Sequence, residues 1–207
     1  MLCGIDEAGR GPVIGPLVVC LAKCSEKHEK RLNSLCKKDS KQLLPEERVR
    51  ILGELEKFCE FFVEVIPAEK INRLMEEMSL NDIEASVMAG LMKKVRCHNV
   101  IIDMPDKYEW VFRKRMEKFG IFKFEAEHKA DENFPIVAAA SICAKVVRDR
   151  EVEKLHKVVG DFGSGYPSDE KTIEFLRNKE NLKKAEKYIR KKWKTLENVL
   201  QRKLEVE

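Results

Sequence analysis

The first residues of the chain contain two adjacent carboxylates followed by a glycine-rich turn. Asp6 and Glu7 end a short apolar segment, and Gly9-Arg10-Gly11 follows almost at once. Carboxylates at the end of a strand can hold a hard divalent cation. Glycines on both sides of an arginine let backbone amides approach a sugar–phosphate chain closely. The run indicates metal-assisted chemistry on a phosphodiester, although a strand followed by a tight turn would also produce it.

Two further carboxylates stand where the chain leaves a predicted element. Asp103 ends the apolar segment 99–103, and Asp131 precedes a long predicted helix. Alternatively, Asp131 could cap that helix and Asp103 could be an ordinary loop residue. If the strands that end in Asp6 and Asp103 are parallel neighbours, their ends converge at the edge where open α/β sheets place their sites.

Clustered carboxylates in a dry cleft require a cation, because like charges repel and raise one another's pKa. No histidine of this chain pairs with cysteine or carboxylate at the spacing typical of zinc. We therefore expect Mg²⁺ or Mn²⁺. Two such cations about 4 Å apart can activate a water molecule and stabilise the leaving oxygen of an in-line displacement.

Hydrophobic periodicity predicts the elements that position these side chains. Ser79 with Asp82 matches a capping box, and the small apolar residues of 137–144 would let a helix lie very close to a sheet. Alternating strands and helices predict parallel strand pairs and an α/β fold with a C-terminal helical extension. Strands are expected over 1–7, 13–22, 61–66, 99–103 and 121–126, and helices over 45–59, 68–78, 79–97, 108–119, 134–158 and most of the chain from Ser168 onward.

Length and charge constrain the organisation of the chain. A chain of 207 residues fits about one to one and a half domains. We expect a catalytic domain over 1–160, with a substrate-reading loop and a basic helical extension over 161–207 packed on it. Charged residues make up 37% of the chain. This abundance fits a surface of ion-pair networks, as in proteins from hot environments.

Residues 177–207 carry 11 basic and 5 acidic residues, a net charge of +6 that leaves −2 for the rest of the chain. This basic tail indicates a polyanionic partner, although a solvated helical face would give the same pattern.

The cysteines and the N-terminus predict a cytoplasmic protein. The seven cysteines form no CxxC pair, and their odd number argues against a fully paired disulfide framework. Most have apolar neighbours, as buried thiols do, which indicates a reducing compartment. One pair could still form in a protein from a hyperthermophile. No signal peptide is evident, and no apolar stretch approaches the roughly 18 residues that span a bilayer.

Five segments together resemble type 2 ribonuclease H (ribonuclease HII), and its archaeal branch in particular. The resemblance implies a ribonuclease H-like mixed sheet flanked by helices. It also implies hydrolysis of the RNA strand of RNA–DNA hybrids and incision 5′ of single ribonucleotides in duplex DNA, leaving 5′-phosphate and 3′-hydroxyl ends. The segments are GIDEAGRGPVIGP at 4–16, KDSKQL at 38–43, NVIIDMPD at 99–106, EHKADENFPIVAAASICAKVVRDRE at 127–151 and GSGYPSD at 163–169.

The resemblance also implies roles for individual residues. The backbone of the Gly9-Arg10-Gly11 turn would read the ribose 2′-hydroxyl, the group that separates RNA from DNA. Tyr166 would support this reading at an RNA–DNA junction, unless it is a loop tyrosine packed on the core. The expected catalytic carboxylates and metal ligands are Asp6, Glu7, Asp103 and Asp131. The candidate phosphate contacts are Lys41, Arg48, Lys145 and Arg148, of which the last two could instead form ion pairs on a helix surface.

Two other functions stay open at this point. One is a metal-dependent DNA nuclease on the same fold, since fold alone does not fix function. The other is a non-catalytic RNA-binding protein that acts through its basic tail. The turn with Tyr166 argues against the first, and four central carboxylates, which would repel nucleic acid, argue against the second. We expect a monomer and a structural role for His128. A partner such as a replication clamp, which would recruit the protein to replicating DNA, is possible, but residues 203–207 show no clear docking motif.

Overall fold

The computed structural model describes residues 1–36, 43–97 and 99–204, so the candidate contact Lys41 lies outside the described residues. Within these ranges no helix is both long and apolar enough to cross a membrane. The elements, in chain order, are β1 (Leu2–Ala8), β2 (Leu17–Cys24), η1 (Glu26–His28), α1 (Glu29–Leu35), α2 (Pro45–Leu55), β3 (Cys59–Ile66), α3 (Ala68–Leu74), α4 (Leu80–Val95), β4 (Val100–Asp103), α5 (Glu109–Lys118), β5 (Glu125–Glu127), α6 (Ala130–Asn133), α7 (Pro135–Val159), α8 (Glu170–Arg177), α9 (Lys179–Lys184), η3 (Glu186–Tyr188) and α10 (Lys194–Leu204).

The chain forms two compact units, each assembled from three segments of sequence. The first unit comprises residues 1–8, 18–64 and 79–147, and the second comprises 9–17, 65–78 and 148–207. The expected domains were 1–160 and 161–207. In the structure the division falls within α7, and two earlier segments belong with the C-terminal part of the chain.

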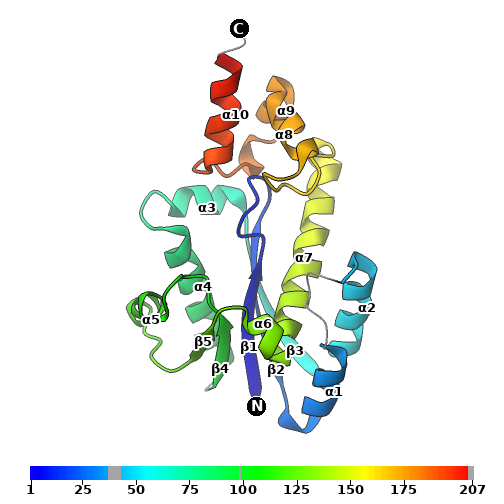
Figure 1. The fold of residues 1–207 in the computed structure, drawn as a ribbon, viewed down its shortest axis with the longest axis vertical. Helices are drawn as coiled ribbons and strands as arrows, with labels where there is room; N and C mark the ends of the chain where they lie inside the picture. Colours follow the sequence, from blue (N-terminus) through cyan, green and yellow to red (C-terminus); the bar gives the residue numbers. More distant parts are fainter. Residues whose placement is uncertain (37–42, 98, 205–207) are drawn as a thin grey trace. The chain divides into compact units, whose positions relative to one another are not determined.

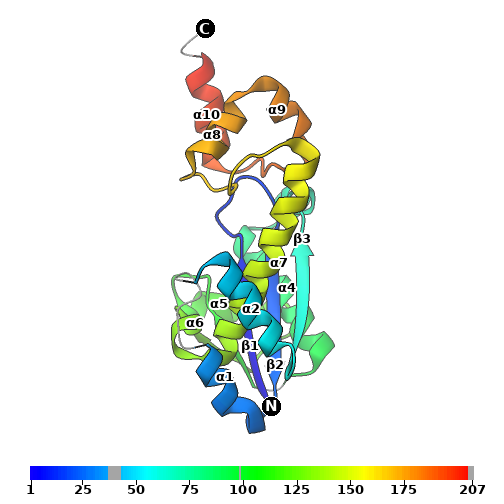
Figure 2. The same ribbon diagram turned by 90° about the vertical axis from the view of Figure 1, so that its right-hand side faces the viewer.

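The strands form one mixed sheet in the order β3-β2-β1-β4-β5. Strand β1 pairs antiparallel with β2 and parallel with β4, and β4 pairs parallel with β5. Helices α1, α2 and the first part of α7 lie on one side of the sheet, and α4 and α5 lie on the other (Figures 1 and 2). The expected α/β class with a mixed sheet flanked by helices is confirmed.

Strand β2 begins later than the apolar pattern predicts. It starts at Leu17, and before it Ile14 makes only an isolated antiparallel bridge to Ile189. Val13 and Ile14 are nevertheless fully buried, in the apolar core of the second unit. Burial without strand geometry therefore produced the strand-like pattern over 13–16.

The ends of other predicted elements are also corrected. The strand expected over 121–126 is reduced to β5, whose three residues pair with Ile101, Ile102 and Asp103 of β4. The helices expected over 45–59 and 68–78 end at Leu55 and Leu74. The start of α4 is as predicted, since the Ser79 hydroxyl accepts a hydrogen bond from the Asp82 N–H.

Gly4 allows α7 to lie directly against the sheet. A Cβ atom at Gly4 would lie 2.7 Å from the backbone carbon of Ile136 and 2.7 Å from the nitrogen of Val137. Only glycine tolerates such an approach, because it carries no Cβ. The residues of α7 at this point, 137–140, are buried, so the close packing expected of its small apolar face is confirmed.

The second unit has an apolar core of its own. Buried side chains from the segment before β2, the end of α7, the loop after it and the C-terminal helices meet there. The basic C-terminal extension is therefore part of a packed unit and not a detached arm. Its buried residues are Val13, Ile14, Val152, Val159, Phe162, Phe175, Leu176, Ala185, Ile189 and Val199.

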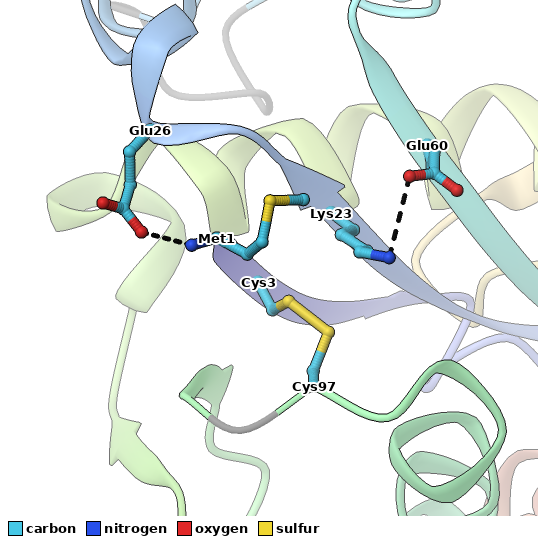
Figure 3. The surroundings of a disulfide bond; sticks show 6 residues. All are labelled: Met1, Cys3, Lys23, Glu26, Glu60 and Cys97. Atoms are coloured by element: carbon cyan, nitrogen blue, oxygen red, sulfur yellow. Dashed lines mark hydrogen bonds and ion pairs between the residues drawn. A yellow bond between two sulfur atoms is a disulfide. The ribbon is translucent and has the colours of Figure 1, made fainter.

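A disulfide joins Cys3 in β1 to Cys97, which precedes β4 (Figure 3). Their Cα atoms are 6.6 Å apart, and the parallel pairing of β1 with β4 brings the N-terminal ends of the two strands together. The other five cysteines are buried free thiols. The sequence left open that one pair of cysteines could form a disulfide, and the structure contains one such pair. An ion pair between Lys23 and Glu60 at 3.7 Å lies nearby (Figure 3).

We expect reduction of this disulfide to lower thermal stability. The bridged cysteines are 94 residues apart, and closing a loop of that length restricts the unfolded chain, typically by about 2–4 kcal/mol. For a protein of this size each kcal/mol shifts Tm by about 2–4 °C. Cys97→Ser should have the same Tm as the reduced wild-type protein and should not respond to reductant. A wild-type Tm that reductant leaves unchanged would contradict the prediction.

Candidate active site

The pairing of β1 with β4 brings Asp6 and Asp103 to the same edge of the sheet. In the parallel register Ile5 is the partner of Ile102, and the next residue along each strand is a carboxylate. The expectation that these strands are parallel neighbours is confirmed. Asp6 is 5% exposed, so its carboxyl group lies almost entirely away from solvent.

Asp131 lies in α6, a single turn between β5 and α7. The N–H of Ala130 donates a hydrogen bond to Oδ1 of Asp103 at 3.1 Å. Lys129, just before this turn, has a left-handed backbone with φ of 57°. Asp131 therefore precedes the long helix, as predicted, but it occupies its own buried turn, which Asp103 fixes through Ala130.

Burial and neighbouring charge raise the pKa of Asp6 from 3.8 to about 8. Burial is the largest cause, and the charges of Asp103 and Asp131 act in the same direction. A hydrogen bond with the Ser141 side chain opposes the rise, as does the Glu7 N–H, which donates to Oδ1 of Asp6 at 2.7 Å. Burial, assisted by the neighbouring negative charges, thus allows Asp6 to retain a proton near neutral pH.

These carboxylates have the chemistry of a site for a hard divalent cation. Their oxygen atoms are the ligands that Mg²⁺ and Mn²⁺ prefer, and a cation would relieve the repulsion that raises the pKa of Asp6. In the described part of the chain, no three His, Cys, Asp or Glu side chains are already arranged to hold a metal ion. Mutual repulsion opposes their convergence. The donor set fits such an ion, and Asp6, Glu7, Asp103 and Asp131 are the residues that would hold it.

Sequence reasoning missed Ser141, which contacts the candidate site. It is the one hydroxyl in the small apolar run of α7, it is 6% exposed, and it forms a hydrogen bond with Asp6. A polar residue in an otherwise apolar helical face is a signal that could have identified it. The helix that packs against Gly4 of the sheet therefore also contributes a hydrogen bond to the buried Asp6.

The glycine-rich turn belongs to the second unit. Gly9 has a φ of 85°, and a Cβ atom there would lie 2.6 Å from the Pro16 carbonyl oxygen and 2.8 Å from Cδ of Arg148. Both the backbone conformation and the lack of space require glycine at this position. A Cβ at Gly11 would lie 3.5 Å from the ring of Tyr166. The structure thus places Gly9 and Gly11 of the turn close to Arg148 and Tyr166, two other residues expected to contact the substrate.

Arg148 supports the Tyr166 ring from within the unit. Its guanidinium lies 4.9 Å from the ring centroid, and its Nη2 donates to the Ser164 carbonyl at 2.8 Å. Arg148 is only 5% exposed, and burial lowers its pKa. These contacts favour a role in holding Tyr166 over a free position at the surface.

The other candidate contacts lie in the first unit. Arg48 on α2 is buried and donates from Nη1 to the Leu43 carbonyl at 2.7 Å. Lys145 is half-buried on α7. His128 is exposed, with Nε2 3.1 Å from the Lys107 carbonyl oxygen, which fits the structural role expected of it. The structure therefore places Arg148 beside Tyr166 and assigns Arg48 and Lys145 to the other unit.

Comparison with known proteins identifies relatives over almost the whole chain. The family model described as Ribonuclease HII matches residues 3–196. The chain is similar to Ribonuclease HII of Archaeoglobus fulgidus, with 40% identity over 205 residues that cover 99% of each protein.

Solved structures of related proteins share the architecture. The PCNA:RNase HII complex from Archaeoglobus fulgidus contains a chain with a TM-score of 0.88, 40% identity and 96% coverage of both chains. Ribonuclease H2 from Pyrococcus horikoshii has a TM-score of 0.84, 37% identity and 97% coverage of both. Bst-RNase HIII in complex with Mn²⁺, at 24% identity, has a TM-score of 0.78 and covers 97% of this chain and 69% of its own, which shows a common fold.

We expect Asp6→Asn to stabilise the metal-free protein, increasingly so as the pH rises. The folded protein holds a proton on Asp6 up to about pH 8, whereas the unfolded chain releases it near 3.8. The contribution of Asp6 to the free energy of unfolding is therefore present at low pH and is lost between about pH 4 and 8. The neutral amide of asparagine removes this loss.

The measurement is Tm in EDTA at pH 5 and pH 8.5. The variant should exceed the wild type by more at pH 8.5 than at pH 5. The control is Glu29→Gln, which removes an exposed carboxylate on α1. The Tm of this variant should be close to that of the wild type at both pH values. A gap between Asp6→Asn and wild type that does not change with pH would show that the charge on Asp6 is not the cause.

Proposed function

Because the chain belongs to the ribonuclease HII family and is a ribonuclease H, we propose that it hydrolyses the RNA strand of RNA–DNA hybrids and also incises duplex DNA 5′ of a single ribonucleotide. The products would carry 5′-phosphate and 3′-hydroxyl ends. The observation that carries the proposal is the buried Asp6 beside Asp103 and Asp131, with its raised pKa. Such a cluster costs stability, and phosphodiester hydrolysis is the chemistry that uses it.

The proposed cofactor is Mg²⁺ or Mn²⁺, held by the four carboxylates as a pair of ions. A bound cation of this kind activates water and stabilises the leaving oxygen. Support comes from the all-oxygen donor set and from the repulsion that a cation would offset. The related fold of Bst-RNase HIII was solved in complex with Mn²⁺, which is consistent with this choice.

Residues of the chain fix the orientation of these carboxylates. Oδ1 of Asp6 accepts from the Glu7 N–H, and Ser141 forms a further hydrogen bond with the same side chain. Oδ1 of Asp103 accepts from the Ala130 N–H. Each of these bonds leaves further lone pairs on the carboxylate for a ligand. The acceptors are therefore oriented before the substrate binds, which lowers the reorganisation needed during reaction.

The turn Gly9-Arg10-Gly11 and Tyr166 would select the sugar. RNA differs from DNA by one hydroxyl per nucleotide, which can donate and accept a hydrogen bond. The absence of side chains at Gly9 and Gly11 allows the backbone to approach that group, and the phenol of Tyr166 packs beside Gly11. The proposed task of this region is to recognise the 2′-hydroxyl where RNA meets DNA.

Partners are proposed on the same basis. Nucleic acid with a ribonucleotide strand is the substrate, and the basic residues of 177–207 would attract its phosphates. The relative from Archaeoglobus fulgidus forms a complex with PCNA, so docking of a monomeric enzyme on a replication clamp, in the cytoplasm, is part of the proposal.

The first test is cleavage of a labelled DNA duplex that contains one ribonucleotide, beside its all-DNA control. We expect a cut 5′ of the ribonucleotide that requires Mg²⁺ or Mn²⁺ and disappears in EDTA. Asp103→Asn should reduce the rate by more than about 100-fold, because it removes a proposed metal ligand, while Glu29→Gln keeps the wild-type rate. Cutting of both duplexes would favour a DNA nuclease, and tight binding without cutting would favour an RNA-binding protein.

The second test concerns Tyr166. We expect Tyr166→Ala to lower kcat/KM on the single-ribonucleotide duplex by roughly 5- to 100-fold, the loss of one hydrogen bond and its packing. Tm should change by less than about 3 °C, since the ring is half-buried at the surface. Tyr166→Phe keeps the ring and isolates the hydroxyl. Equal losses of stability and activity would show that Tyr166 only packs the loop.

A further inference from the structure

We propose that Arg190 and Trp193, in the C-terminal segment, are positioning residues that hold the turn Gly9-Arg10-Gly11 in its reading conformation. The inference rests on the proposed function and deepens it. It assigns to part of the basic extension a role in sugar selection that is distinct from attraction of phosphates. Neither side chain is among the residues that the sequence motifs identified.

The guanidinium of Arg190 donates hydrogen bonds to backbone carbonyls of the turn and of Gly15. Its Nη2 donates to the carbonyl oxygen of Gly9 at 2.6 Å, its Nη1 to that of Arg10 at 3.0 Å, and its Nε to that of Gly15 at 3.0 Å. Arg190 is fully buried, with 0% exposure. A buried cation that donates three charge-assisted hydrogen bonds fixes its acceptors more firmly than neutral donors would.

Trp193 completes the set of bonds. Its Nε1 donates to the carbonyl oxygen of Gly11 at 3.1 Å, and the guanidinium carbon of Arg190 lies 5.0 Å from the centroid of its ring. The three successive carbonyls of the turn are therefore all held by side chains of one short segment, 190–193. This arrangement accounts for the conformation of a turn that glycine leaves otherwise unrestricted.

Holding these carbonyls determines where the amides point. In a trans peptide the N–H is directed opposite to the preceding C=O. When Arg190 holds the carbonyls of Gly9 and Arg10, the N–H groups of Arg10 and Gly11 are directed away from it. Those amides are the backbone donors that the turn would offer to a ribose hydroxyl. The carbonyl of Gly11 precedes Pro12, which has no N–H, so the set of donors ends there.

The segment is positioned independently of the two side chains. The Arg190 N–H donates to the Val13 carbonyl at 2.8 Å, and the Gly15 N–H donates to the Tyr188 carbonyl at 2.9 Å. Asn72 accepts from the Lys191 N–H at 2.8 Å. Substitution of the Arg190 or Trp193 side chain therefore leaves the backbone pairing in place, so the fold and the reading function can be tested separately.

The decisive variant is Trp193→Phe, which keeps an aromatic ring and removes the donor to Gly11. Arg190→Lys keeps the charge but replaces a three-nitrogen donor by a single ammonium group. Lys194→Gln is the matched control, because it removes one positive charge from the same segment at an exposed position. The readouts are kcat/KM on the single-ribonucleotide duplex, Tm, and the ratio of affinities in EDTA for duplexes with a ribonucleotide or a deoxyribonucleotide at one position.

We expect Trp193→Phe to lower the affinity ratio and kcat/KM by about 3- to 10-fold, the effect of one hydrogen bond, with Tm within about 3 °C of wild type. Arg190→Lys should lower both by more than 10-fold, and Lys194→Gln should change neither the ratio nor Tm. If Arg190→Lys unfolds, Trp193→Phe decides alone. Wild-type ratios in Trp193→Phe, or equal weakening on both duplexes that follows Tm, would overturn the inference. A wild-type enzyme that does not distinguish the two duplexes would overturn the proposed sugar reading and the inference together.

Discussion

The parallel pairing of β1 with β4 is the constraint on which the carboxylate site depends. Side chains alternate between the faces of a strand, so a shift of one residue would turn Asp6 away from Asp103. The same pairing fixes Asp103, which in turn accepts the Ala130 N–H and holds the turn that carries Asp131. The Cys3–Cys97 disulfide links the chain at the N-terminal ends of these two strands. One strand pair thus determines the relative placement of three carboxylates.

The site is electrostatically unfavourable, and packing elsewhere in the first unit compensates for it. Burial and like charge raise the pKa of Asp6, which is the cost of holding carboxylates close together in a buried position. The close approach of α7 to Gly4 gives this unit a dense apolar layer. The same helix contributes Ser141 to Asp6. Stability and orientation at this edge of the sheet therefore come from one helix, and a larger residue at position 4 would disturb both.

Local patterns in the sequence were sufficient for part of the fold and for the proximity of Asp6, Asp103 and Asp131, whose role as metal ligands stays a prediction. Apolar runs located β1 and β4, the capping box located the start of α4, and position at element ends selected Asp6, Asp103 and Asp131. Patterns failed where tertiary burial replaced local geometry. Val13 and Ile14 are buried by packing in the second unit and not by a strand. Strand β5 is defined by its pairing with residues 101–103 of β4, which the residues of β5 alone do not reveal.

Contacts between distant parts of the chain were beyond sequence reasoning. Arg190 is one of 11 basic residues in 177–207, and nothing in its neighbours separates it from those that face solvent. Arg190 lies 181 residues after Gly9 in the sequence, yet in the structure its guanidinium donates a hydrogen bond to the carbonyl oxygen of that glycine. A charge pattern records how many cations a segment carries, whereas function depends on which of them are buried. Only the fold supplies that distinction.

The two units use buried charge in opposite ways. In the first unit, carboxylates lie close together, and the pKa of Asp6 rises because the group is buried and because Asp103 and Asp131 add negative charge. In the second unit, the charge of Arg190 is distributed over the carbonyl dipoles of three peptide groups. The first arrangement is incomplete until a ligand binds, whereas the second is satisfied within the protein and is rigid for that reason. The proposed hydrolytic centre would benefit from unsatisfied charge, and the proposed reader of one hydroxyl would benefit from donors whose directions are already fixed.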